Sequence, residues 1–365
     1  MSLDDPGEGG IGGGDGDDNS GPGGGDSGED DGGEDDGDGG GDEPGDAITG
    51  IYRVQSTMDL SSSPIVQDLA GDALGTINDL ANDPVTTLMD LLESANVPIL
   101  DQLLALLPDL LLEPFKGFVN DFVLGQVVGS LPFRDQVLAM ATDLTTLLTQ
   151  FDLVSQFELT SVDQAGGVAL ARHTLSGVEF HLDDQDLFVD TPELVDQITT
   201  ASDVTCSVAL GEYEGSIQVG DHAFGLPLGG FVLDGLNQSL LGSFGLGDVR
   251  GTLGALFDCP ALAEDVSSRC LGILCVGNRD QIEAFCEAGL DQAAARIENS
   301  LLTALDLAEV RLEAGDAILR DDGEADGLVD LLDQGNWQTI VVVDGVELPF
   351  SAAFVGRRIG DGAPD

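Results

Sequence analysis

The spacing of apolar residues predicts strands and helices in separate blocks along the chain. Polar and apolar residues alternate from Ile51 to Leu60, which indicates a first strand. From about residue 83 the apolar residues recur at every third or fourth position, as they do in amphipathic helices. Asp83 followed by Pro84 is a typical helix start. A later helix, predicted from about Pro132, carries an apolar stripe that extends to Phe151.

Between residues 152 and 220 every second residue is again apolar, and we predict antiparallel strands with one solvent-exposed face there. The alternation places His173 and His181 on the exposed face. A second helical block follows from about residue 231 to 305, and its clearest helix begins at Asp280. The chain then returns to strands, where TIVVV-DG-VELPF indicates a hairpin with a type I′ turn at Asp344-Gly345.

These blocks predict the α+β class, with an antiparallel sheet packed with Leu-rich amphipathic helices. Because strands both precede and follow the helices, we expect late strands to pair with early ones in a single domain over residues 47–365. The Leu-rich stripes fit ordinary core packing. A surface that binds lipid or a partner helix is the alternative.

Composition sets the first 46 residues apart from the rest. They contain 17 acidic residues, 19 glycines and no Lys or Arg. Such a segment buries too little apolar surface to fold, so we expect residues 1–46 to be a disordered, acidic tether rich in Gly and Asp. The remaining residues include 51 acidic and 12 basic ones, and the whole chain has a net charge of −56. A nucleic acid would be repelled, which excludes that class of partner.

The sequence also bears on the location of the protein. No run of 18 apolar residues is present, so we expect no transmembrane segment. No basic and apolar export signal begins the chain. Because a flexible tether commonly joins a domain to an attachment, we expect an export signal and a lipidated cysteine upstream of Met1. This predicts a lipid-anchored protein of the cell envelope, periplasmic or surface-exposed, with a cytoplasmic protein as the alternative.

Four of the five cysteines are spaced symmetrically, at intervals of 11, 5 and 11 residues. If two antiparallel helices flank the central loop, Cys259 pairs with Cys286 and Cys270 with Cys275. Disulfides would fit an oxidising compartment. Zinc binding is the alternative, although the paired C-x2-C pattern of zinc sites is absent. Cys206 alternates with apolar neighbours, which indicates a buried strand residue.

The sequence contains no recognisable catalytic motif. It has no G-x-S-x-G, no H-E-x-x-H and no G-x-x-x-x-G-K-[ST]. The three histidines, His173, His181 and His222, have no spacing typical of a metal or catalytic site, and we expect them to be solvated surface groups. Trp337, the only tryptophan, is expected to anchor the core. We therefore predict a protein that is not an enzyme, with no catalytic residues to name.

One acidic cluster has the spacing of an EF-hand-type calcium loop. Between residues 322 and 333, oxygen-bearing side chains stand at positions 1, 3, 5, 9 and 12, with glycine at position 6. The residues are Asp322, Glu324, Asp326, Asp330 and Asp333. Position 12 is Asp rather than the usual bidentate Glu, so a calcium cofactor is one interpretation and a solvated loop is the other.

The acidic Gly-rich leader, the loop DDGEADGLVDLL and the closing segment GNWQTIVVVDGVELPFSAAFVGRR together resemble the mature part of an envelope lipoprotein from a GC-rich Gram-negative bacterium. The resemblance covers the leader and about 40 C-terminal residues, and it implies the envelope location given above. The predicted helices and long antiparallel strands are also similar to tubular lipid-binding proteins, an analogy of fold alone.

The sequence leads to a first hypothesis of a tethered envelope protein that binds a lipid or other hydrophobic ligand in an apolar groove. The second hypothesis is a structural or adaptor protein that binds another protein through its Leu-rich helices. An envelope hydrolase is the third hypothesis, and no catalytic motif in the sequence supports it.

Overall fold

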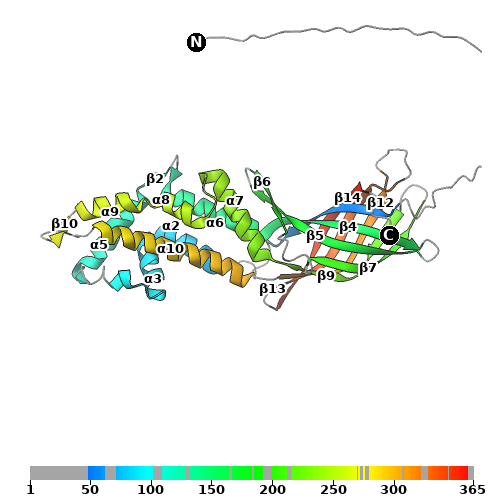
Figure 1. Cartoon of the computed structure of the whole chain (residues 1–365), viewed down its shortest axis with the longest axis horizontal. Coiled ribbons are helices and arrows are strands. Elements are labelled where there is room, and N and C mark those ends of the chain that lie inside the picture. The colour runs from blue at the N-terminus through cyan, green and yellow to red at the C-terminus, as the bar shows by residue number, and fades with distance from the viewer. Residues whose placement is uncertain are drawn as a thin grey trace, which may run out of the picture. The chain divides into compact units, whose positions relative to one another are not determined.

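The computed structural model describes residues 48–61, 71–101, 109–128, 131–163, 167–182, 185–191, 199–211, 215–268, 270–271, 274–275, 279–305, 308–321, 328–343 and 345–360. All of them belong to the compact unit Asp42–Asp365. This unit has the predicted α+β class, with helices and an antiparallel sheet of ten strands (Figure 1).

The strands of the large sheet are β1 (Gly50–Asp59), β4 (Gln150–Asp163), β5 (Val168–Leu182), β6 (Gln185–Asp190), β7 (Thr200–Ala209), β8 (Gly215–Val219), β9 (His222–Leu226), β12 (Ala308–Arg320), β13 (Leu331–Val343) and β14 (Val346–Gly360). Two short pairs stand apart from it, β2 (Val127–Val128) with β3 (Leu131–Pro132) and β10 (Cys270–Leu271) with β11 (Leu274–Cys275). The helices are α2 (Gly71–Asn82), α3 (Pro84–Ser94), α5 (Asp109–Leu124), α6 (Phe133–Thr149), α7 (Leu228–Phe244), α8 (Val249–Leu256), α9 (Cys259–Ser268) and α10 (Arg279–Ala304).

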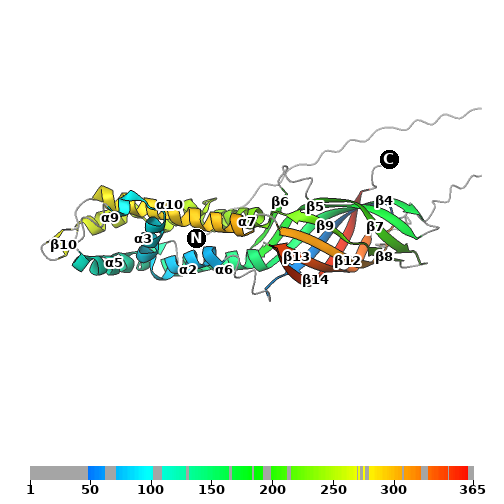
Figure 2. The same cartoon turned by 90° about the horizontal axis from the view of Figure 1, so that it is seen from below.

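The large sheet closes on itself. Its strands follow the order β13, β14, β1, β4, β5, β7, β8, β12, and β12 pairs again with β13. The first strand, β1, therefore lies between the last strand and β4, with Ile51 opposite Gly360 and Gln55 opposite Val154. This confirms that late strands return to pair with early ones. Figure 2 shows the strands wrapping around a common interior.

Aromatic side chains fill the interior of the closed sheet. Trp337 is buried, as predicted, and stacks on Phe354 with ring centroids 4.4 Å apart. It lies opposite Gly315 on β12, and a Cβ atom at Gly315 would come within 2.0 Å of the indole ring. The glycine therefore provides the space that the tryptophan occupies.

The helices pack mainly on one another, and two of them meet the sheet. The long helix α10 contacts α2, α3, α7, α8 and α9, while α6 and α7 contact β4, β5 and β6 (Figure 1). Within the described residues, Leu-rich stripes are buried in this packing, as Leu88 and Leu92 of α3 illustrate. Of the helices described, none is long and apolar enough to cross a membrane.

The predicted element boundaries are confirmed in some places and wrong in one. Helix α3 begins at Pro84, and the Asp83 side chain accepts a hydrogen bond from the Thr86 backbone N–H, as its sequence predicts. Phe151 was expected to end a helical stripe, but α6 ends at Thr149 and Phe151 lies in β4. The side chain is buried in either case, because β4 continues directly from the helix and turns Phe151 toward Phe180 of β5.

Candidate functional site

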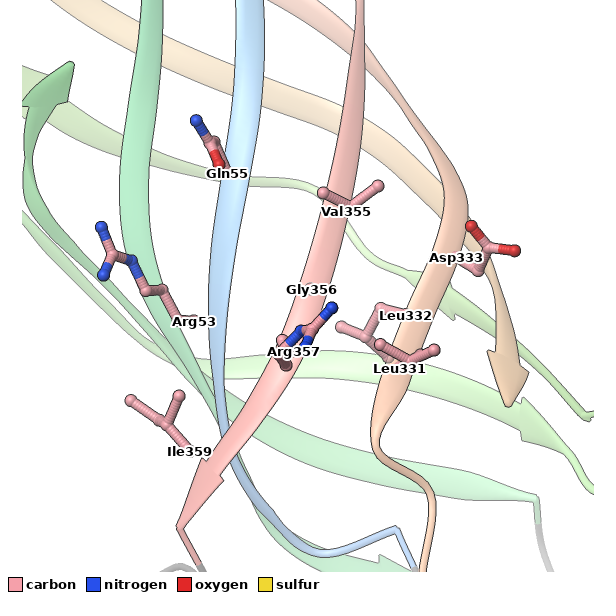
Figure 3. Close-up of a pocket in the computed structure, with 9 residues that line it drawn as sticks. All are labelled: Arg53, Gln55, Leu331, Leu332, Asp333, Val355, Gly356, Arg357 and Ile359. Carbon is pink, nitrogen blue, oxygen red and sulfur yellow. The ribbon is translucent and has the colours of Figure 1, made fainter. Parts of the chain in front are cut away.

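A pocket of about 600 Å³ opens on the outer face of strands β1, β13 and β14. Nine residues line it: Arg53, Gln55, Leu331, Leu332, Asp333, Val355, Gly356, Arg357 and Ile359 (Figure 3). Val355 and Ile359 alternate with Arg357 along β14, and about half of each of the two apolar side chains is exposed, 55% and 54%. The pocket therefore combines exposed apolar surface with two arginines.

An irregularity in strand pairing shapes one wall of this pocket. Leu332 is opposite Gly356 and Gly335 is opposite Phe354, so β13 has two residues where β14 has one. Gln334, in this bulge, has a φ angle of 52°, a conformation that costs energy in residues other than glycine. Gly356 lies against the Leu332 side chain, which a Cβ atom would meet at 2.9 Å. The absence of a side chain at Gly356 therefore leaves room for the buried Leu332 side chain beneath the pocket.

The arginines of the pocket are direct neighbours across the strand pair. Arg53 of β1 is opposite Arg357 of β14, and both side chains are exposed. Figure 3 shows Arg53 leaning toward β4 and Arg357 leaning toward β13, as expected for two like charges. Asp333 is the one carboxylate among the lining residues, and it forms an ion pair with Arg320. The pocket therefore carries a local positive charge in a strongly acidic chain.

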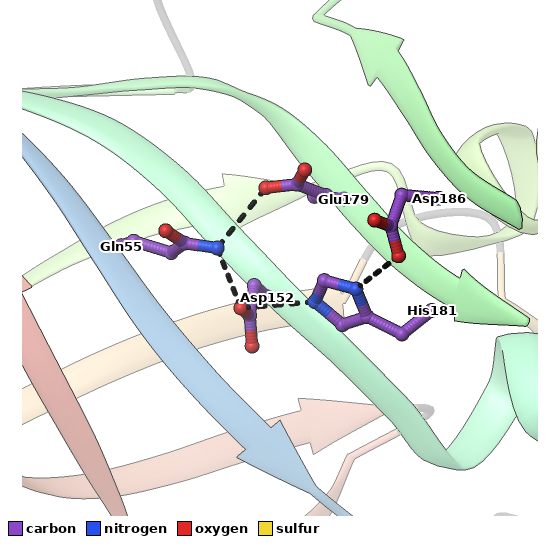
Figure 4. A network of polar contacts seen from close by, with 5 residues as sticks. All are labelled: Gln55, Asp152, Glu179, His181 and Asp186. Carbon is purple, nitrogen blue, oxygen red and sulfur yellow. Dashed lines mark hydrogen bonds and ion pairs between the residues drawn. The ribbon is translucent and has the colours of Figure 1, made fainter.

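A polar network borders the pocket on the same face of the sheet. The Gln55 amide nitrogen donates to a carboxylate oxygen of Asp152 at 2.7 Å and of Glu179 at 3.0 Å (Figure 4). His181 contacts Asp186 at 2.8 Å and Asp152 at 3.1 Å. The hydrogen bond with Asp186, followed by the one with Asp152, raises the pKa of His181. His181 is exposed, as predicted. In this way Gln55 and His181 hold three carboxylates beside the pocket in hydrogen bonds.

A second polar chain lies inside the closed sheet. The Nδ1 atom of His173 is 2.7 Å from Nε2 of His222, and its Nε2 atom is 2.7 Å from the Ser155 hydroxyl oxygen. His222 Nδ1 is 2.9 Å from the carbonyl oxygen of Gly220, which can only accept. One neutral assignment satisfies all three contacts: His222 donates to Gly220, His173 donates to His222, and Ser155 donates to His173.

Ser155, His173 and His222 have the residue types of a hydrolytic triad, but the nucleophile is enclosed. Ser155 is 2% exposed and His173 is 1% exposed. His173 stacks on Trp337 and meets the edge of Phe157. Burial lowers the pKa values of both histidines, and the charge of His222 lowers that of His173 further. The Ser155 hydroxyl is therefore not accessible to a substrate in this structure, and the three residues form a hydrogen-bonded network in the interior.

The prediction that His173 is a solvated surface group is wrong. Residues 178 and 180 face inward, and strict alternation would turn residue 173 outward. However, β5 has one extra residue, because Leu175 is opposite Ser155 while Gly177 is opposite Val154. This extra residue inverts the alternation, so that His173 faces the interior. His222, also expected to be solvated, is half-buried against His173.

Three of the five residues in the predicted calcium loop, Asp322, Glu324 and Asp326, lie outside the described residues. Asp330 precedes β13, where its carbonyl oxygen accepts from the Arg358 N–H at 2.8 Å. Asp333 lies in β13, bound to Arg320. Calcium binding at this loop stays a prediction, which calorimetric titration of the wild type and of Asp326→Ala would test.

The predicted disulfide between Cys259 of α9 and Cys286 of α10 is present. Cys270 and Cys275 are directly opposite in the β10–β11 pair, as the nested pattern requires. Their side chains lie outside the described part of the chain, so the second bond stays a prediction. Cys206 is a free thiol on β7, buried as expected, and burial raises its pKa to about 12. Such a thiol is unreactive near neutral pH.

Comparison with known proteins found no family model, no curated protein and no solved structure that matches the chain.

Proposed function

We propose that the protein is a non-enzymatic binding protein that holds a hydrophobic ligand, such as a lipid, in the pocket on β1, β13 and β14. The observation that carries this proposal is the exposure of Val355 and Ile359 beside Leu331 in one concave site. A volume of about 600 Å³ is in the range of small-ligand pockets. Apolar side chains that line a pocket lose contact with water when an apolar ligand enters, and this favours binding.

This pocket lies on the sheet and not on the Leu-rich helices, for which a lipid-binding surface was one interpretation of the sequence. The Leu-rich stripes of the described helices pack against other helices, and the interior of the sheet is occupied by side chains such as Trp337 and Phe354. On the outer face of the sheet, in contrast, Val355 and Ile359 stay accessible within a pocket.

We also propose a location in the cell envelope, with the acidic leader as a tether and a lipid anchor upstream of it. The Cys259–Cys286 disulfide supports an oxidising compartment, since such bonds are rare in the reducing cytosol.

An adaptor function is the second candidate. Leu241 on α7 is 55% exposed and Leu302 on α10 is 41% exposed. These side chains lie on helices and would contact a partner protein rather than a small ligand.

Native mass spectrometry of the full chain, purified without detergent, tests the two candidates. We expect a bound small molecule in the wild type and its loss in the double variant Val355→Ser, Ile359→Ser. Val346→Ser is the matched control, because Val346 is a partly exposed valine near the other end of β14, outside the pocket lining. A stable complex with another protein and no bound small molecule would contradict ligand binding and favour the adaptor function.

A further inference from the structure

The arginine pair is an unusual feature of this surface. Arg53 and Arg357 are directly opposite across β1 and β14, and like charges in that position destabilise a sheet. Within the part of the chain that the structure describes, neither side chain has an ion pair or a hydrogen bond. The chain has 68 acidic residues against 12 basic ones, so carboxylate partners are abundant. In a chain with so many carboxylates, it is unusual that two neighbouring arginines have no partner among the described residues.

Most of the other described basic residues are paired with carboxylates. Those in ion pairs are Lys116, Arg172, Arg250, Arg279, Arg296, Arg311 and Arg320. The contrast shows that the acidic surface generally neutralises its arginines. Arg134 donates to the neutral Asn82 side chain, whereas Arg53 and Arg357 are two neighbouring arginines without either kind of partner among the described residues.

Two described carboxylates near the pair form ion pairs with other residues. Glu158, diagonal to Arg53 across β1 and β4, forms an ion pair with Arg172. Asp333, in the pocket wall, forms one with Arg320. Directly opposite Arg53 on β4 is Gln156, which has no charge. The positive charge of the two arginines is therefore available to a ligand.

Apolar surface lies on both sides of this charge. Val355 and Ile359 flank Arg357 on β14, and Leu331 is opposite Arg357 on β13. A ligand that uses the whole pocket needs a compact anionic group for the arginines and an apolar part for these side chains. Arginine binds carboxylates and phosphates through two parallel hydrogen bonds, which favours such a group over a neutral one.

We propose that Arg53 and Arg357, whose exposed side chains lean apart in this structure, turn toward each other and bind the anionic head group, a carboxylate or a phosphate, of an amphiphilic ligand. The apolar part of this ligand lies on Val355, Ile359 and Leu331. This inference rests on the proposed function and gives its ligand a chemical class. The anionic group offsets the repulsion between the two guanidinium groups, and the apolar part accounts for the exposed side chains around them.

Calorimetric titration of the full chain with three probes tests the proposal. The probes are decanoate, decanol of the same length, and inorganic phosphate. In the wild type we expect decanoate to bind at least about tenfold more tightly than decanol, the difference that one or two charge-assisted hydrogen bonds give. In the double variant Arg53→Gln, Arg357→Gln, decanoate and decanol should bind equally tightly. Arg311→Gln is the matched control, since Arg311 is an exposed arginine on β12 of the same sheet, outside the pocket lining and paired with Glu309 and Glu347, and this variant should keep the wild-type preference.

The outcomes separate this inference from the proposed function. Equal binding of decanoate and decanol, both weakened by Val355→Ser, Ile359→Ser, would overturn the anionic head group and leave hydrophobic ligand binding intact. Phosphate that binds as tightly as decanoate, lost in Arg53→Gln, Arg357→Gln, would support a site for a free anion and overturn the amphiphile. No binding by any probe would overturn both proposals. Circular dichroism of each variant confirms that the fold is retained.

Discussion

At the residue scale, the packing of the interior depends on a glycine, which has no side chain. Gly315 leaves the space in which the Trp337 ring lies, and a Cβ atom there would be 2.0 Å from the ring. We predict that Gly315→Ala lowers the free energy of unfolding by about 1–3 kcal/mol, because the tryptophan must shift in a packed interior. Urea denaturation measures the change. Gly360→Ala, a strand position with open space for a Cβ atom, is the control and should leave stability almost unchanged.

The pKa shifts of the three histidines determine how they make stability depend on pH. Burial lowers the pKa of His173 and His222, so below pH 6.5 the unfolded chain takes up protons that the folded chain does not. Their contribution is therefore complete above pH 6.5 and is lost as the pH falls below it. The raised pKa of His181 acts in the opposite direction, because protonation there favours the folded state.

We predict that the free energy of unfolding falls between pH 7 and pH 5.5 and that His181→Asn makes this fall steeper. Removing His181 removes the one histidine whose protonation stabilises the fold. Denaturation series at several pH values measure the slope. An unchanged or shallower slope in the variant would show that the Asp186 and Asp152 contacts do not hold the protonated form.

At the element scale, local signals predicted much of the fold. Alternation located β1, the Asp83-Pro84 start located α3, and the Asp-Gly signal located the β13–β14 hairpin. The class and the Cys259–Cys286 bond also followed from local patterns. Each of these features depends on residues close in sequence or on a regular period.

Features that depend on pairing between distant segments were not predictable in this way. The extra residue of β5 inverted the face of His173, and nothing local marks that position. The Arg53–Arg357 pair arises because the first and last strands of the sheet are neighbours in one particular register. A shift of a single residue would separate the two side chains onto opposite faces. The pocket was therefore not predicted from the sequence. The segment VGRRIG does show that Val355, Arg357 and Ile359 share one face of a strand, but it does not show which strands lie beside them.

The β10–β11 pair leads to a prediction about covalent structure. Cys270 and Cys275 are opposite one another, a position from which side chains of antiparallel strands can bond. We predict that they form a second disulfide nested within the first. Peptide mapping without reduction should yield two linked pairs and one free thiol at Cys206. Two additional free thiols at positions 270 and 275 would contradict the nested arrangement.

At the scale of the whole molecule, charge repulsion opposes folding. A net charge of −56 gives mutual repulsion that salt screens, since the Debye length falls from about 30 Å at 0.01 M to about 8 Å at 0.15 M ionic strength. We predict that the midpoint of thermal unfolding rises over this range. Calorimetry with sodium chloride and with choline chloride measures it. Equal effects of the two salts indicate screening, and a rise with sodium alone would indicate a specific cation site instead.

The pairing of β1 with β14 has a consequence for biosynthesis. These neighbouring strands come from opposite ends of the described chain, so β1 waits for its partner until nearly all of that chain has left the ribosome. During this interval the edge of β1 presents unsatisfied backbone groups that favour association with other chains. Association between incomplete chains would therefore compete with the pairing of the final strand.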